Sequence, residues 1–236
     1  MLLAKLMRAP IGILAFLAAA LVAGCGGSSS DQATPPVQRE SDHAPAGYRV
    51  RSVPEDGFSI AFPRRWQVVN HYDVQNEPGI VSSLSRIYPK ISNTVAAAAE
   101  EGSPVKLVGF DVQTARTTPT TVSVIVATPP RGPFEVWTKS VAKDVRSGSG
   151  KGVRVAERSL QIPAGRAFVL TYSRRVGGTR VTSVHAFVVR GGRMFIVTVS
   201  AAARAPALLE RIVRTLTVTG AAPADDSPGI PDPNAG

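Results

Sequence analysis

The chain has 236 residues, with 27 Lys and Arg against 17 Asp and Glu, and its formal net charge is +10. This length allows one domain or two small ones. The single cysteine excludes an internal disulfide framework and any multi-cysteine zinc or iron–sulfur site. Beyond the N-terminal segment there is no purely apolar run of about 18 residues, so we expect no internal transmembrane bundle.

Residues 1–24 predict a signal peptide. Lys5 and Arg8 supply positive charge, and residues 11–24 form an apolar stretch that is short for a membrane-spanning helix. The small residues before Cys25 resemble the lipobox of bacterial lipoproteins. The resemblance implies that Cys25 becomes the mature N-terminus and carries acyl chains such as palmitate, which anchor the chain to the extracytoplasmic face of the cell membrane. The alternative is an uncleaved anchor helix, which also places the remaining residues outside the cytoplasm.

Composition divides the rest of the chain into three parts. Residues 25–46 contain Gly, Ser and Pro and almost no large apolar residue. This composition predicts a disordered tether. Residues 221–236 combine proline with aspartate and predict a disordered acidic tail. The folded domain is therefore expected over residues 47–220, which carry most of the positive charge.

The first half of this domain mixes strands and helices. Residues 58–62 alternate in hydrophobicity and predict a strand that ends at Pro63. Apolar residues from Ile80 to Ala98 recur at helical spacing, and Pro89 interrupts them, so we expect a kink or two successive helices. Strands are then expected at 105–112 and 121–128. A helix is expected after Gly132-Pro133, with Phe134, Trp137, Val141 and Val145 on its apolar face.

The second half predicts four successive strands and a final helix from Pro206. The strands are expected at about 153–161, 166–175, 180–189 and 194–200, with the glycine pairs 177–178 and 191–192 in tight turns. Several strands carry apolar residues on both faces, which indicates a sheet that is covered on both sides. The fold class expected is α+β: a mainly antiparallel sheet covered by helices on both faces, an α/β/α sandwich.

Two stretches resemble a known family. The run from Gly57 to Trp66 resembles the opening strand and turn of PsbP-like domains, and residues 167–197 with the closing helix resemble their second half. The layout is also similar to the LpqN-type lipoproteins of high-GC bacteria. The resemblance implies an α/β/α sandwich with a non-catalytic, extracytoplasmic binding or accessory role. It carries no metal-ligating or binding residue over to this chain.

No catalytic constellation is apparent, and we predict that the chain is not an enzyme. The only Cys is the predicted lipid site, and His185 is expected as a hydrogen-bonded histidine within a strand. His71 with Asp73 lacks a third metal ligand, so both are expected to be surface residues. Asp111 is expected in a strand, paired with an arginine. The sequence indicates no cofactor and no metal, and a hydrolase remains the least favoured alternative.

The basic excess is the main functional indication. The candidate ligand-binding residues are arginines at expected turns: Arg64, Arg65, Arg174, Arg175, Arg180, Arg190 and Arg193. A lipid-tethered domain outside the cytoplasm meets anionic lipid headgroups and wall polymers, and each Lys or Arg near such a surface contributes about 1 kcal/mol. We therefore predict binding of an anionic envelope component. The alternative is an accessory subunit that binds a protein of an envelope complex, and the compartment argues against nucleic acid.

Overall fold

The computed structural model describes residues 44–77, 79–148, 153–176, 178–202 and 205–219. The predicted signal peptide, Cys25, nearly all of the predicted tether and the predicted tail lie outside these residues. Those assignments therefore stay predictions. Within the described residues, no helix has both the length and the hydropathy needed to cross a membrane.

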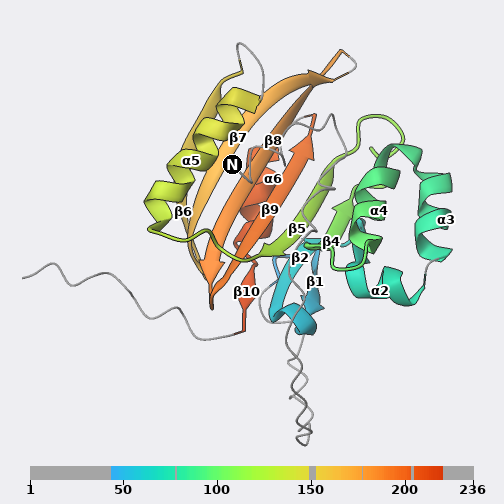
Figure 1. Ribbon diagram of the computed structural model, residues 1–236. Helices are drawn as coiled ribbons and strands as arrows, with labels where there is room; N and C mark the ends of the chain where they lie inside the picture. The colour runs from blue at the N-terminus through green and yellow to red at the C-terminus, as the bar shows by residue number, and fades with distance from the viewer. Residues whose placement is uncertain (1–43, 78, 149–152, 177, 203–204, 220–236) are drawn as a thin grey trace, which may run out of the picture.

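A sheet of seven antiparallel strands forms the centre of the molecule (Figure 1). Its strand order is β3-β4-β5-β9-β8-β7-β6, so the four strands from β6 to β9 form a continuous meander at one side of this sheet. At the β8–β9 turn, Gly191 and Gly192 have φ angles of 57° and 71°, which suit a two-residue hairpin. The strands are β3 (Gln67–Asn70), β4 (Val105–Phe110), β5 (Thr121–Ala127), β6 (Val155–Ile162), β7 (Gly165–Val176), β8 (Thr179–Arg190) and β9 (Arg193–Ala201).

One face of this sheet is covered by a small second sheet and a helix. Strands β1 (Tyr48–Val53), β2 (Phe58–Pro63) and β10 (Thr217–Val218) form the three-stranded sheet in the order β1-β2-β10. They pack with helix α6 (Ala205–Val213) on the apolar residues of β7, β8 and β9 that point to this side.

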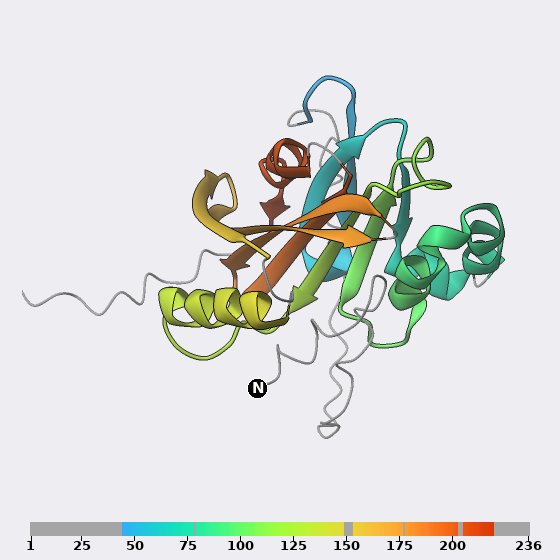
Figure 2. The same cartoon turned by 90° about the horizontal axis from the view of Figure 1, so that it is seen from above.

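The opposite face is covered by two separate groups of helices (Figure 2). Helix α5 (Phe134–Gly148) packs through Trp137 and Val141 onto Phe168 and Phe187. The second group covers β3, β4 and β5 and buries Val95 and Phe110. It consists of α2 (His71–Asn76), α3 (Gly79–Ile87), the 3₁₀ turn η2 (Pro89–Ile91) and α4 (Ser92–Ala99).

The predicted fold class is confirmed, because the main sheet is antiparallel and helices lie on both of its faces. The break at Pro89 is confirmed as well, since η2 separates α3 from α4. The expected helix face is wrong at Ile87, which is 47% exposed because it ends α3 where the chain turns away. The sequence analysis missed β1, the short 3₁₀ turn η1 (Pro54–Asp56), β3, α2 and β10.

One row of cross-strand neighbours defines the two ends of the large sheet. This row runs across all seven strands through Gln67, Phe110, Thr121, Ser200, Ser183, Tyr172 and Val155. The β7–β8 turn lies on one side of this row, at the top of Figure 1, and we call that side of the sheet the arginine end. The other side, which holds the β8–β9 turn, is the distal end.

Candidate functional site

A hollow of about 710 Å³ opens at the arginine end, where β7 extends beyond the start of β6. Val155 of β6 lies opposite Tyr172, and β7 continues to Val176 and then turns into β8. Four arginines line the hollow, and we call them the hollow arginines: Arg154, Arg174, Arg175 and Arg180. Among the described residues, the remaining lining residues are apolar or uncharged, and none is a carboxylate.

The positions of the hollow arginines follow from strand pairing. Arg175 and Arg180 are direct cross-strand partners, and both are exposed. Like charges directly opposite one another repel, so this pairing costs stability in the absence of an anion. Arg174 alternates to the other face of β7, where its side chain is half-buried and its Nε is buried with no hydrogen-bond partner among the described residues. No ion pair within the described ranges engages any of the four.

A polar group of side chains lies beside Arg174 on the same face. The ring of His185 stacks on Tyr172 with 5.5 Å between centroids and 12° between planes. Its Nδ1 is 2.9 Å from Thr198 Oγ1, and its Nε2 is 3.3 Å from Tyr172 Oη. Burial, and secondly the positive charge of Arg174, lower the pKa of His185 to about 4. His185 is therefore neutral near pH 7, and the prediction of a hydrogen-bonded histidine within a strand is confirmed.

Arg64 and Arg65 also lie at the arginine end, in the β2–β3 turn. That turn leads into β3, which is the edge strand opposite β6. Arg65 contacts Asp111, with 3.5 Å between its guanidinium nitrogen and Oδ2, and Arg64 Nε donates to Tyr48 O. The expected arginine partner of Asp111 is thus confirmed. The expected strand position is wrong, because β4 ends at Phe110 and Asp111 begins a turn in which its Oδ1 accepts from Gln113 N.

Arg190 and Arg193 lie at the distal end, so they cannot share a site with the hollow arginines. They are cross-strand partners at the β8–β9 turn. Strand β8 has 12 residues, which separates its two ends by about 35 Å. The structure therefore divides the seven predicted arginines into three groups and adds Arg154, which the sequence analysis missed.

His71 differs from its prediction. It is buried at the start of α2, and its Nδ1 lies within hydrogen-bond distance of Ala98 O. An expected surface residue is thus a structural link between α2 and the end of α4. Asp73 is exposed as expected. Within the described ranges, no group of three His, Cys, Asp or Glu residues is placed to hold a metal ion.

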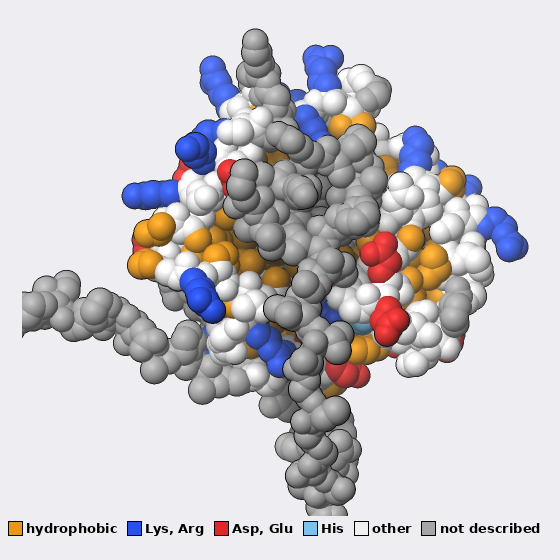
Figure 3. Space-filling model, in the orientation of Figure 1, with side chains coloured by type: hydrophobic (Ala, Val, Ile, Leu, Met, Phe, Trp, Pro, Cys, Tyr) orange, Lys and Arg blue, Asp and Glu red, His pale blue; other side chains and the backbone are white. Residues whose placement is uncertain are grey.

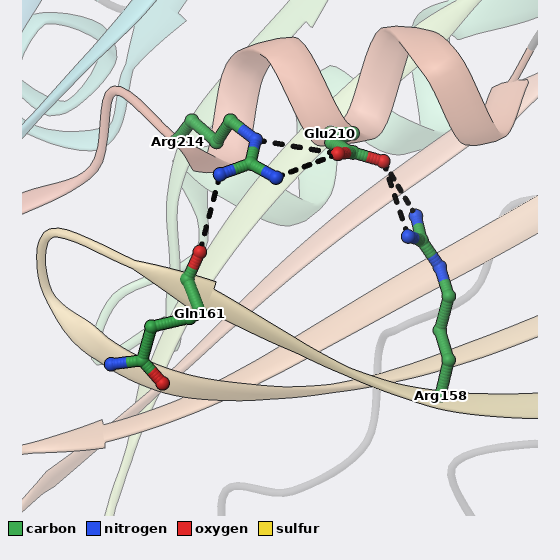
Figure 4. A network of polar contacts seen from close by, with 4 residues as sticks. All are labelled: Arg158, Gln161, Glu210 and Arg214. Atoms are coloured by element: carbon green, nitrogen blue, oxygen red, sulfur yellow. Dashed lines mark hydrogen bonds and ion pairs between the residues drawn. The ribbon is translucent and has the colours of Figure 1, made fainter.

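Other arginines are engaged in structural contacts. Figure 4 shows Glu210 of α6 between Arg158 of β6 and Arg214, with guanidinium–carboxylate distances of 3.1 and 2.8 Å. Arg214 also donates to the main-chain oxygen of Gln161 at 3.2 Å. The hydrogen bonds from both arginines hold the pKa of Glu210 below its usual range. This network fastens α6 to the β6 edge of the sheet.

Comparison with known proteins gives only distant similarities. No family model matches the sequence, and no curated protein matches it. Among solved structures, cyanobacterial PsbP (CyanoP) from Synechocystis sp. PCC 6803 is 16% identical with a TM-score of 0.48, covering 78% of this chain and 99% of its own. A Bacteroides thetaiotaomicron protein is 12% identical (TM-score 0.39; 69% of this chain, 45% of its own). The Pseudomonas aeruginosa protein of unknown function PA94 is 13% identical (TM-score 0.32; 70% and 88%).

Proposed function

We propose that this chain is a membrane-tethered extracytoplasmic lipoprotein whose domain binds an anionic envelope component without catalysing a reaction. The observation that supports it most is the set of four hollow arginines around one concavity, whose described lining residues include no carboxylate. Arginine guanidinium groups match phosphate and carboxylate oxygens in shape and charge. An anion in the hollow offsets the repulsion between Arg175 and Arg180.

The shape of the hollow favours a polymer or a surface over a small enclosed ligand. It is bordered by exposed side chains and by the turn between two strands, so an extended polyanion has room to pass across it. Several weak, salt-sensitive contacts along such a ligand add up to a useful affinity. The ligand class we propose is a polymer or lipid layer that bears phosphate groups.

A second candidate function is that of an accessory subunit that binds an acidic protein segment. Beyond Tyr172, the outer edge of β7 has no strand partner within the described ranges, because β6 begins at Val155. An extended peptide can pair with such an edge through main-chain hydrogen bonds. Acidic side chains of that peptide would then lie near the hollow arginines.

The test uses the full-length protein in a neutral detergent with inorganic polyphosphate as the probe. The paired variant Arg175→Gln/Arg180→Gln removes two charges at the hollow. At about 1 kcal/mol for each arginine, its affinity for polyphosphate is expected to fall by roughly 30-fold. The matched control is Arg190→Gln/Arg193→Gln, which also removes a cross-strand arginine pair, but at the distal end. This control is expected to change the affinity for polyphosphate by less than about threefold, because salt screens charges that lie so far from the hollow.

Equal losses in the two variants would show that overall charge, and not the hollow, attracts polyphosphate. No binding by the unaltered protein would overturn the proposal itself. If polyphosphate does not bind but an acidic peptide does, and Arg175→Gln/Arg180→Gln weakens binding of that peptide, the accessory-subunit function is favoured. Thermal unfolding of both variants checks that each remains folded.

A further inference from the structure

The described chain begins at the arginine end. Gly47 O accepts a hydrogen bond of 2.9 Å from Arg64 N, and Tyr48 pairs with Pro63. The Arg64–Arg65 turn leads directly into Gln67, which belongs to the row of residues that bounds this end. The start of the domain and the hollow arginines therefore lie on the same side of that row.

The described chain ends at the opposite side. Val218 of β10 pairs with Phe58, and Thr219 N donates to Gly57 O at 2.8 Å. A methyl group added to Gly57 would lie 4.0 Å from Arg193, which stands at the β8–β9 turn. The two ends of the described chain thus leave the domain at opposite ends of the sheet.

The two ends also differ in charge. Beyond the row at the arginine end, the described strands and turns carry the four hollow arginines together with Arg49, Arg64, Arg65 and Arg116, and they carry Asp111, which is buried against Arg65. The distal end carries both signs, with Glu55, Asp56, Glu100 and Glu101 accompanying Arg190 and Arg193. In Figure 3, several Lys and Arg side chains stand at the upper left and top of the molecule, others stand at the right edge and lower left, and the Asp and Glu side chains in view lie mainly at the centre right and below.

We propose that the arginine end rests on the anionic surface of the bilayer that holds the lipid anchor, so that the domain stands with the β7–β8 turn toward the lipid headgroups. This inference rests on the proposed function and names the phosphates of anionic phospholipids as its ligand. Its basis is that the chain joins the domain at the end where cationic side chains are concentrated. The distal end and the C-terminal exit then face away from the membrane.

The length of the connecting segment is consistent with this orientation. Cys25 precedes Ala44 by 19 residues, and the disordered tether predicted from the sequence would span roughly 24 Å r.m.s. over that length. Electrostatic attraction at physiological salt extends only about 8 Å, so the arginines must come close to the headgroups to contribute. A tether joined at the distal end would favour the opposite orientation.

The test places one label at each end of the full-length protein in vesicles. Gln113→Cys lies in the exposed β4–β5 turn at the arginine end, and Gln75→Cys lies on the exposed side of α2, at the lower right in Figure 1. The chain has one native cysteine, which is the predicted lipid site, so the introduced thiol takes the fluorophore. Nickel-chelating lipid headgroups serve as the quencher. The vesicles contain phosphatidylcholine with or without phosphatidylglycerol.

With phosphatidylglycerol present, the Gln113 label is expected to be quenched more strongly than the Gln75 label. Arg175→Gln/Arg180→Gln is expected to shift the equilibrium between this orientation and others by roughly 30-fold, and Arg190→Gln/Arg193→Gln to leave it unchanged. Equal quenching of the two labels, or stronger quenching of Gln75, overturns the orientation. If polyphosphate still binds at the hollow in that case, the proposed function stands and only this inference fails. Labelling of two thiols in each variant would show that Cys25 is unmodified and would remove the anchor on which the inference rests.

Discussion

Arginines occur in two different surroundings in two regions of this molecule. Around Glu210, Arg158 and Arg214 share one carboxylate and fasten α6 to β6. At the hollow, four arginines come together, and no carboxylate lies among the lining residues that the structure describes. The first arrangement compensates its own charge and the second leaves charge available to a ligand. A basic sequence therefore indicates a binding surface only where the fold brings cations together without internal partners.

The largest effect is expected from giving the hollow the internal carboxylate that the α6 network has. Ala156 lines the hollow, is exposed, and lies opposite Thr171 on the face of the sheet that also carries Arg175. Ala156→Glu adds repulsion toward an anion and a competing partner for the arginines. Polyphosphate affinity, measured by titration calorimetry, is expected to fall on the order of 100-fold. The control Gln75→Glu adds the same charge on α2, and an equal loss there would contradict the local role of the hollow.

The reverse change removes the carboxylate from the α6 network. Glu210→Gln eliminates the ion pairs with Arg158 and Arg214 and is expected to lower the free energy of unfolding by about 1–2 kcal/mol. Urea unfolding measures this loss. Polyphosphate affinity at the hollow should stay the same, because the two arginines that lose their carboxylate partner, Arg158 and Arg214, lie beside α6 and do not line the hollow. Unchanged stability would show that the network contributes nothing beyond surface charge.

His185 is expected to make stability depend on pH. Its pKa is about 4 in the folded protein and about 6.5 when unfolded, so the unfolded chain binds more protons between these values. Stability therefore falls as the pH falls from about 6.5 toward 4, by roughly 1 kcal/mol over the first pH unit. Urea unfolding of His185→Gln should show a flatter pH dependence than the unaltered protein. Parallel curves for the two proteins would refute a neutral His185.

The smallest expected effect links His185 to the hollow. The charge of Arg174 contributes to lowering the pKa of His185, so an anion that neutralises Arg174 should raise this pKa. The expected rise with polyphosphate is a few tenths of a pH unit, measured by NMR titration of the imidazole. Arg174→Gln should raise the pKa by itself and remove the response to polyphosphate. A response that survives this substitution would mean that the anion binds elsewhere.

Much of the fold could be predicted because its elements carry strong periodic patterns. The long strands β7 and β8 contain runs of apolar residues that fill both faces and are separated by glycine turns, and Pro89 breaks the helical pattern at a defined point. Short elements were missed because they carry little pattern of their own. Strand β3 has four residues and β10 has two, and both exist through pairing with distant partners.

The candidate site was only partly predictable because it depends on which turns meet in space. Successive turns of an antiparallel meander lie at alternate ends of the sheet, which by itself separates Arg180 from Arg190. This rule was available from the sequence and would have divided the predicted set. Arg154 carried no such signal in the sequence. It lies at the hollow because β6 begins opposite Tyr172, whereas β7 continues four residues beyond that point. His71 was misplaced because α2 was not recognised.

The most direct test of the central claim is amide hydrogen exchange of the full-length protein with and without polyphosphate. We expect slower exchange in the peptides that contain Ser173–Val176 and Thr179–Val181, and no change in peptides that span Arg190–Arg193 at the distal turn. Protection at the distal turn, or spread evenly over the basic peptides, would contradict the assignment of anion binding to the hollow arginines.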